Sequence, residues 1–293
     1  MQTKTVIEKL NNTVTQPDHD TVLLFLHIPK AAGTTLTNCI YNEYRDQEQW
    51  KAEGNWLIDG IYYYPARLLK PKNPEIAPEI RTALNRPDVK VVVGHFTFGI
   101  HQEVLKPCSY MTFIRDPVER VISLYSHIKR YRDTELHKEV VEKSLSIEQF
   151  TRDLECRETN NDQVRRIAGV NPPFGQCTKY DLELAMENLE KHFSVVGITE
   201  RFDETLLLAK RKFRWVAPIY YLPSLVNSNR KRRTELSEST ISAISELNSL
   251  DYELHKFAEN LLNASIKNEG SDFQLELHRF QQENEKYMNR DSE

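Results

Sequence analysis

The sequence predicts an α/β protein in which a central parallel sheet is flanked by helices and followed by a helical C-terminal part. Apolar runs of the kind that buried strands require alternate along the chain with segments of helical periodicity. Two of these runs lead directly into helix-start signals, and no internal repeat or clear domain boundary interrupts the pattern. Because open parallel sheets bind ligands at the carboxyl ends of their strands, we expect the functional residues there.

Buried strands are expected where apolar residues follow one another with little interruption, at residues 21–28, 89–96, 110–116 and 192–200. Helices are expected where apolar residues recur every three or four positions. These segments are residues 33–44, 116–130, 146–169, 180–192 and 202–213, with one long helix from residue 235 to about residue 261.

Residues 45–88 are aromatic and rich in proline. They are predicted to be irregular near the prolines, and an insertion that shapes a substrate cleft is one interpretation of them. The whole chain then divides into a polar N-terminal segment at 1–20, a main domain at 21–265 and a charged C-terminal helix or tail at 266–293.

The composition is that of a globular protein, with 39% hydrophobic and 28% charged residues among 293. The net charge of −4 hides two basic runs, residues 210–214 and 230–233, with four basic side chains in each. Such runs attract anions locally, although an ordinary solvated face explains them equally well. The four cysteines form no pattern of metal ligands, so we expect no metal site.

No apolar run approaches the roughly 20 residues that are needed to cross a bilayer, and residues 1–20 lack the apolar core of a signal peptide. We therefore expect a cytoplasmic protein with reduced thiols, without a membrane span and without a nucleic-acid partner. The sequence does not determine the oligomeric state, and a homodimer is among the alternatives.

The stretch PKAAGTT at residues 29–35 joins the first strand to the first helix and has the character of an anion-binding turn. Backbone N–H groups in a first helical turn lack intrahelical partners, and the helix dipole adds a positive field. Gly33 would let the backbone approach an anion, Thr34 and Thr35 would add hydroxyl donors, and Lys30 would add a charge. The alternative is an ordinary strand-to-helix turn with a surface lysine.

The position of the lysine separates this turn from the GxxxxGK[ST] phosphate loop. In that loop the lysine is followed by a Ser or Thr that holds Mg²⁺ for nucleotide chemistry. Here Lys30 comes before the glycine. We interpret the turn as a site for a phosphate-like group that does not depend on magnesium.

A second anion site is predicted at the junction of strand 110–116 and the following helix. Asp116 is a natural N-cap, Pro117 suits the first helical position and Glu119 completes a capping-box pattern. Arg115 leaves the strand end, where a guanidinium grips a phosphate with two hydrogen bonds, and Ser123 lies about two turns into the helix. A capped helix with a structural Arg–Asp pair is the alternative.

His95 comes directly after the run VVVG in the stretch 89–96 and is the candidate general base. A lone histidine after a strand is more often structural, but this one lies between the two predicted anion sites, where a base with a near-neutral pKa is useful. His27 is its rival; its place within the first strand favours a structural role.

Several of these segments together resemble a known family. The loop HIPKAAGTTL, the later RDPVERVISLY and the GH between them resemble the carbohydrate sulfotransferases that use 3′-phosphoadenosine 5′-phosphosulfate (PAPS), most closely the heparan sulfate 6-O- and 2-O-sulfotransferase branch. Residues 160–169, 185–206 and 245–261 share the resemblance, which covers most of residues 22–262.

The resemblance implies a P-loop-like α/β sulfotransferase fold and a role for each motif. His95 would be the catalytic base, Lys30 would be catalytic as well as cofactor-binding, and Arg230 would be a weaker candidate for the cofactor or an acidic acceptor. The implied site for the 5′-phosphosulfate is Lys30, Ala31, Ala32, Gly33, Thr34 and Thr35, and that for the 3′-phosphate is Arg115 and Ser123.

The implied reaction is in-line transfer of a sulfuryl group from PAPS to a hydroxyl, with 3′-phosphoadenosine 5′-phosphate (PAP) as the product. The acceptor is expected to be a carbohydrate or another hydroxyl compound. Two features differ from the heparan branch, which is anchored in the Golgi membrane and acts on an acidic polymer: no anchor is found here and the net charge is negative. A kinase-like phosphotransferase and a nucleotide-binding protein without catalysis are the alternative functions.

Overall fold

The computed structural model describes residues 21–44, 57–58, 61–64, 78–132, 136–222 and 232–290. The predicted polar segment at 1–20 and the cofactor candidate Arg230 lie outside these residues.

Within the described residues, six strands form one sheet in the order β2-β3-β4-β1-β5-β6. The strands β3, β4, β1, β5 and β6 run parallel, and β2 pairs antiparallel with β3 at one edge. Their bounds are β1 Val22–Leu26, β2 Leu57–Ile58, β3 Ile61–Tyr64, β4 Val91–Gly94, β5 Cys108–Ile114 and β6 Phe193–Ile198. The four predicted strands and their parallel arrangement are confirmed.

The central strand β1 shows why these runs are continuously apolar. All five of its residues are buried, and Leu24 lies opposite Val92 of β4 on one side and Tyr110 of β5 on the other. A strand with neighbours on both sides and helices on both faces leaves no polar surface for an alternating pattern. Because these neighbouring strands are parallel, the carboxyl ends of β1, β4 and β5 lie together along one side of the sheet.

Within the segment 45–88, the described residues supply β3 and β2 to the sheet and the helix α3 (Pro78–Leu84), none of which was predicted. The proline-rich stretch at 65–77, predicted to be irregular, lies outside the described residues. Ile61 is buried, and the run Ile61–Tyr64 has the aromatic and β-branched composition that favours strands. The nearby prolines concealed this signal. A contribution of the segment to a substrate cleft stays a prediction.

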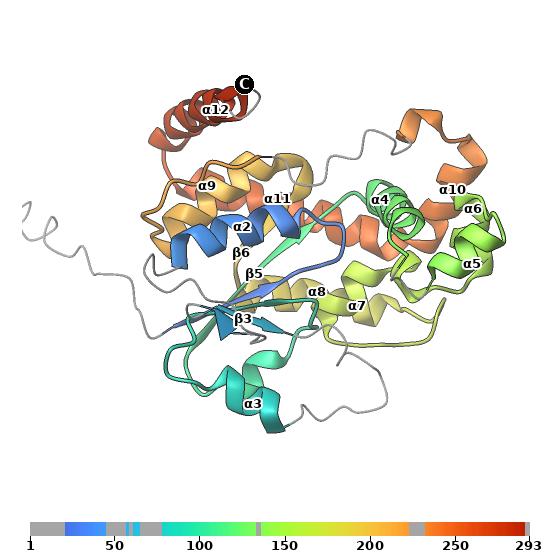
Figure 1. Cartoon of the computed structure of the whole chain (residues 1–293), viewed down its shortest axis with the longest axis horizontal. Coiled ribbons are helices and arrows are strands. Elements are labelled where there is room, and N and C mark those ends of the chain that lie inside the picture. Colours follow the sequence, from blue (N-terminus) through green and yellow to red (C-terminus); the bar gives the residue numbers. More distant parts are fainter. Residues whose placement is uncertain are drawn as a thin grey trace, which may run out of the picture.

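The helices lie on both sides of the sheet and at one end of the molecule (Figure 1). In that view α2 and α9 lie above the sheet and α3 lies below it, while α4, α5, α6 and α10 gather at one end of the molecule. Besides α3, their bounds are α2 Gly33–Tyr44, α4 Pro117–Arg130, α5 His137–Glu142, α6 Ile147–Asp153, α7 Asp162–Ala168, α8 Lys179–His192, α9 Phe202–Phe213, α10 Glu238–Leu247, α11 Ser249–Asn268 and α12 Asp272–Arg290.

Two predicted helices are each divided in the structure. Residues 146–169 form α6 and α7 with a 3-10 turn between them, and the helix expected from residue 235 breaks at Asn248 into α10 and α11. The buried Asn248 side chain donates to the carbonyls of Thr159 and Ile244, and its oxygen accepts from the N–H of Asn161. One side chain thus connects the two helix breaks. Because this contact joins residues that are far apart in the sequence, helical periodicity does not predict it.

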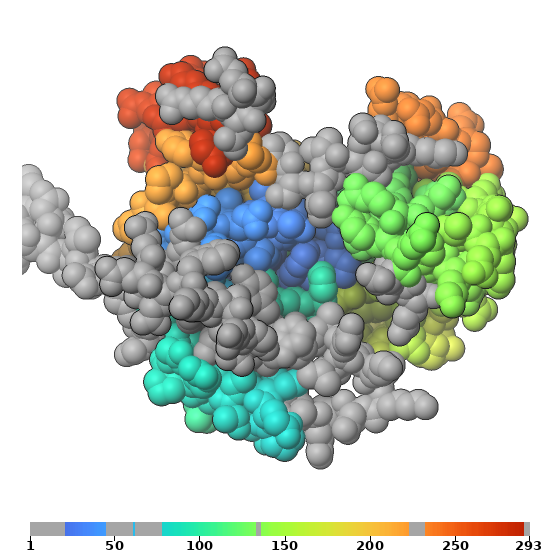
Figure 2. Space-filling view, viewed as in Figure 1, coloured from blue at the N-terminus to red at the C-terminus, as the bar shows by residue number. Residues whose placement is uncertain are grey.

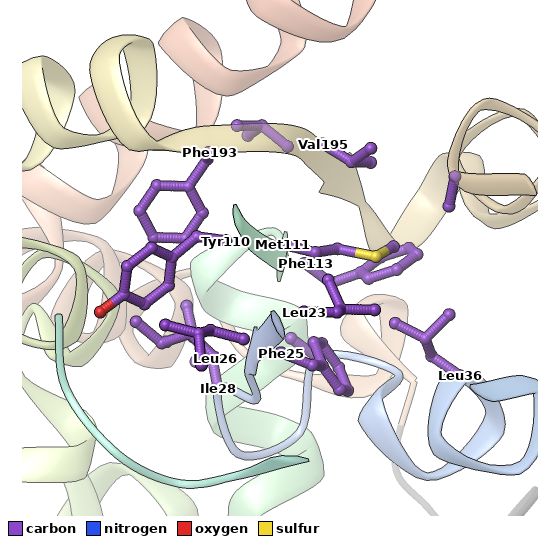
Figure 3. Close-up of a cluster of buried hydrophobic side chains, with 14 of the residues drawn as sticks. Leu23, Phe25, Leu26, Ile28, Leu36, Tyr110, Met111, Phe113, Phe193 and Val195 are labelled. Carbon is purple, nitrogen blue, oxygen red and sulfur yellow. The ribbon is translucent and has the colours of Figure 1, made fainter. Parts of the chain in front are cut away.

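The core follows this grouping. A large hydrophobic cluster lies between the sheet and its helices. Figure 3 shows part of this cluster, including Phe25 of β1 and Leu36 of α2. The rings of Tyr110 and Phe193 also pack there, with their centroids 5.0 Å apart. A second cluster joins α4, α5, α6 and α10, and includes Val121, Ile128 and Phe150. The helices at that end therefore have a core of their own.

Part of the basic run at 210–214 has a structural role. Arg211 of α9 forms ion pairs with Glu269, Asp272 and Glu276, and its guanidinium lies 5.3 Å from the ring of Phe273. These contacts attach α12 to α9. The predicted boundary between residues 265 and 266 falls inside α11, and the division of the chain into segments stays a prediction.

No described helix combines the length and the apolarity that crossing a membrane requires.

Candidate functional site

The turn between β1 and α2 has an unusual backbone. Lys30 and Ala32 both have positive φ, 71° and 54°, while the buried Ala31 lies between them. Non-glycine residues in this region cost roughly 1 kcal/mol or more each and occur where the surroundings enforce them. Left-handed residues occur in the turns whose N–H groups form anion-binding nests. Here the N–H of Ala31 donates to the carbonyl of Ile28 at 3.2 Å, so the N–H groups that would meet an anion are those at the start of α2. The first turn of α2 holds no acidic residue, so no carboxylate of its own competes for this position.

Gly33 is required here for a reason that the sequence did not indicate. A Cβ atom on Gly33 would lie 1.9 Å from Cδ2 and Nε2 of His27. The imidazole therefore fills the space that the missing side chain leaves, and this space does not face a ligand. The N–H groups of the first turn still point out of the helix N-terminus, as in any helix.

The turn between β5 and α4 is built differently. The carboxylate of Asp116 accepts a hydrogen bond from the N–H of Glu119 at 2.9 Å, and Pro117 occupies the first helical position, so the predicted N-cap is confirmed. The return half of the capping box is not formed with Glu119, since the N–H of Asp116 donates to Glu200 instead.

Arg115 connects the two turns. Its Nη1 donates to the backbone carbonyl of Lys30 at 2.8 Å, and its side chain is 15% exposed. Carboxylate oxygens of Glu119 and Glu200 each lie 3.8 Å from the guanidinium. The side-chain amide of Gln163 bonds both the N–H and the carbonyl of Arg115, which fixes its backbone. The structure thus brings Lys30 and Arg115 together.

The other predicted residue of the second site is on α4, and part of the basic run 230–233 lies near the start of that helix. Ser123 is half-buried about two turns into that helix. Arg233, at the end of the basic run 230–233, contacts Asp116 at 3.2 Å, which brings the described end of this run next to Arg115.

His95 lies at the carboxyl end of β4, and one of its two ring nitrogens already forms a hydrogen bond. Its Nδ1 is 2.9 Å from the backbone carbonyl of His27. Because a carbonyl only accepts, Nδ1 carries the proton and Nε2 keeps its lone pair. Burial lowers the pKa of His95, and the charge of Arg166 lowers it further. The hydrogen bond to the His27 carbonyl partly offsets this shift. His95 is therefore neutral near pH 7, the form that accepts a proton.

Sequence reasoning missed the charged cluster behind His95. Arg166 donates to the carbonyl of His95 at 2.9 Å and pairs with the buried Asp162 at the same distance, while the fully buried Arg120 also reaches Asp162, at 3.4 Å. Although burial raises it, the pKa of Asp162 is held below its usual value by Arg166 and Arg120. These residues lie far from His95 in the chain, so no local pattern joins them.

His127 was also missed. It lies one turn after Ser123 on α4. Burial lowers its pKa to about 4, with further contributions from the charges of Lys30, Arg130 and His95. Its spacing from Ser123 at i and i+4 is the signal that places both side chains on one face of α4.

In Figure 2 the blue atoms of the β1–α2 region lie between those of α9 and those of α4. Among the described residues, no group of three or more His, Cys, Asp and Glu side chains is placed to hold a metal ion. The absence of a metal requirement stays a prediction.

A small-residue turn between a buried strand and a helix, at the carboxyl ends of the strands of a parallel sheet, is a feature that α/β proteins use to bind anions. The sequence matches the model of the sulfotransferase family over residues 11–258, and the chain belongs to that family. The predicted sulfotransferase α/β fold is thereby confirmed.

Curated relatives share a smaller part of the chain. The chain is similar to heparan-sulfate 6-O-sulfotransferase 1 of Homo sapiens, with 30% identity over 180 residues that cover 52% of this chain and 43% of the relative. It is 28% identical to heparan-sulfate 6-O-sulfotransferase 2 of Gallus gallus over 181 residues, with the same coverage of both chains. The chain thus spans less than half the length of these relatives. The predicted relation to this branch is confirmed.

Proposed function

We propose that the protein transfers the sulfuryl group of PAPS to a hydroxyl group of a carbohydrate. One observation carries the proposal: the left-handed turn at Lys30–Ala32, the guanidinium of Arg115 and the neutral His95 are all at the carboxyl ends of β1, β5 and β4. Membership of the sulfotransferase family supplies the reaction class.

The residues at this edge suit a donor that carries anionic groups at both ends. The turn at residues 30–35 and the start of α2 would hold the 5′-phosphosulfate through backbone N–H groups, the hydroxyls of Thr34 and Thr35, and Lys30. Arg115, with Ser123 on α4, would hold the 3′-phosphate. PAPS supplies an activated sulfuryl group whose departure leaves negative charge on a phosphate oxygen.

Each of the two proposed catalytic residues has a separate task. His95 uses Nε2 to take the proton from the acceptor hydroxyl, since Nδ1 is held by the carbonyl of His27. Lys30 lies in the turn and places positive charge where the leaving oxygen becomes negative, which lowers the barrier if the charge is preorganised.

The acceptor class rests on the relatives. Those that match are named for heparan sulfate, so a glycan hydroxyl is the proposed acceptor. The cytoplasmic location stays a prediction.

The test is to incubate the full chain with ³⁵S-labelled PAPS and a panel of glycans that includes heparosan, N-sulfated heparosan and heparan sulfate, with small alcohols alongside. We expect label in at least one glycan, and we expect Lys30→Ala to abolish it. Lys90→Ala is the matched control, because Lys90 is an exposed lysine just before β4 and its removal is expected to change nothing.

Binding measurements distinguish the alternatives. Tight binding of ATP with Mg²⁺ and none of PAP would overturn the proposal in favour of a phosphotransferase. Binding of PAP without transfer to any acceptor in the panel, by a chain that also fails to hydrolyse PAPS, would favour a protein without catalysis.

A further inference from the structure

The ring of His27 lies between the anion turn and the base. Its centroid is 4.3 Å from that of His95, with the planes 38° apart, and 5.6 Å from that of Phe25, nearly parallel to it. The Cα of Gly33 closes the space on another side, since a Cβ there would overlap the ring. His27 is thus in contact with both parts of the candidate site.

The backbone of His27 acts on the same neighbours. Its N–H donates to the carbonyl of Gly94, the residue before the base, and its own carbonyl accepts from Nδ1 of His95. The main chain of His27 therefore selects the tautomer of His95, and its ring limits how the neighbouring imidazole turns.

The His27 ring acts by shape and not by charge. Burial lowers its pKa well below the usual value, and the nearby His95, Arg166 and Lys30 lower it further. A ring that stays neutral contributes packing against Gly33 and His95 throughout the neutral pH range.

We propose that His27 is a positioning residue that couples the anion turn to the catalytic base, so that a change in the turn at Gly33 alters the orientation of His95. This inference rests on the proposed function for its kinetic consequence, but its structural consequence can be measured without any activity.

The first experiment removes the ring. We expect His27→Ala to lower kcat by about 10- to 100-fold, because a misplaced catalytic group loses that much, while KM for PAPS changes less than about threefold. The activity-independent readout is the ¹⁵N NMR signature of the His95 imidazole. The backbone carbonyl of residue 27 remains in His27→Ala, but without the neighbouring ring the imidazole can turn away from it, so we expect one Nδ1–H tautomer to change to a mixture. If His27→Ala does not fold, His27→Asn is measured in its place with the same expectations.

The second experiment is a double-mutant cycle with Gly33→Ala. Alone, this substitution must displace the His27 ring, so we expect it to lower both the stability and kcat. In the His27→Ala background the obstructing ring is gone, and we expect Gly33→Ala to cost at least about tenfold less in kcat and clearly less in the unfolding midpoint.

His101→Ala is the matched control. His101 is also a half-buried histidine in a ring cluster, with Tyr110 and His192, but it lies beside the start of β5 at the opposite end of the sheet. Its removal is expected to leave kcat and the His95 signature unchanged.

The outcomes separate the two proposals. An unchanged His95 tautomer in His27→Ala, or additive effects of His27→Ala and Gly33→Ala on stability, would overturn the positioning role. Absence of sulfuryl transfer by the wild-type chain, together with a changed tautomer and a non-additive stability cycle, would overturn the proposed function and leave the positioning role standing.

Discussion

The two strand-to-helix turns at the edge of the sheet have the same place in the fold but opposite designs. The turn into α4 is completed by its own side chains: Asp116 caps the helix and Glu119 stands in its first turn. The turn into α2 has Ala32 where a capping side chain would be, no acidic residue in the first turn, and two left-handed residues.

Under the proposed function, this difference corresponds to two ways of binding an anion. A helix N-terminus that is already capped by a carboxylate offers little to a second anion, so the α4 turn contributes through the side chain of Arg115. The α2 turn has no such carboxylate and contributes through its backbone. We therefore assign a backbone site and a side-chain site to the two ends of one cofactor.

The largest expected effect is at the base that lies between the turns. We expect His95→Ala to reduce transfer by roughly 10²–10⁴-fold, the usual contribution of a general base, while PAP binds with nearly wild-type affinity. Initial rates and calorimetric titration measure the two quantities. Near-full activity in this variant would remove His95 from catalysis.

The second-largest effect is expected when a negative charge is added to the α2 turn. Thr34 is exposed in the first turn of α2, and Thr34→Asp places there the carboxylate that the α4 turn already has. We expect the affinity for PAP to fall by about tenfold or more, because like charges at this distance repel strongly. Thr34→Asn is the matched control without the charge, and equal losses in both variants would refute the backbone site.

Arg115→Lys tests the side-chain site. Lysine keeps the charge but loses the planar fork and the bond to the carbonyl of Lys30, so we expect the affinity for PAP to fall about tenfold. Arg81→Lys changes an exposed arginine that pairs with Glu103, and it should leave binding unchanged. An affinity that stays the same in Arg115→Lys would exclude Arg115 from the site.

The cap of α4 is expected to matter for stability more than for binding. Asp116→Ala removes the acceptor for the N–H of Glu119, which should lower the free energy of unfolding by about 1 kcal/mol in chemical denaturation. A loss of PAP affinity larger than the loss caused by Arg115→Lys would mean that the α4 turn binds the anion through its backbone after all.

The smallest effect concerns pH. Because burial lowers the pKa of His95, the free enzyme keeps a neutral base below pH 6.5, and the acid limb of kcat/KM should lie below that value. The same shift has a consequence for stability: below pH 6.5 the unfolded chain takes up a proton that folded His95 does not, so stability falls as the pH falls. An acid limb above pH 6.5 would contradict the burial of the base.

The sequence predicted those parts of the fold and site that depend on local pattern. Four strands, the helix α2 and the capped start of α4 follow from apolar runs and turn residues, and His95 was placed between the two turns by the order of the motifs. Contacts between distant residues were not predictable. The pairing of β3 with β4, the breaks joined by Asn248, and the packing of His27 on Gly33 each depend on residues that meet only in the folded chain.

The most direct test of the two-turn account varies the protein and the ligand together. Calorimetric titration would compare PAP with adenosine 5′-phosphate, which lacks the 3′-phosphate, in the wild-type chain, Thr34→Asp and Arg115→Lys. We predict that the roughly tenfold penalty of Arg115→Lys disappears with adenosine 5′-phosphate while the penalty of Thr34→Asp persists. Persistence of the Arg115→Lys penalty with adenosine 5′-phosphate, or loss of the Thr34→Asp penalty, would contradict the assignment of the two turns to opposite ends of the cofactor.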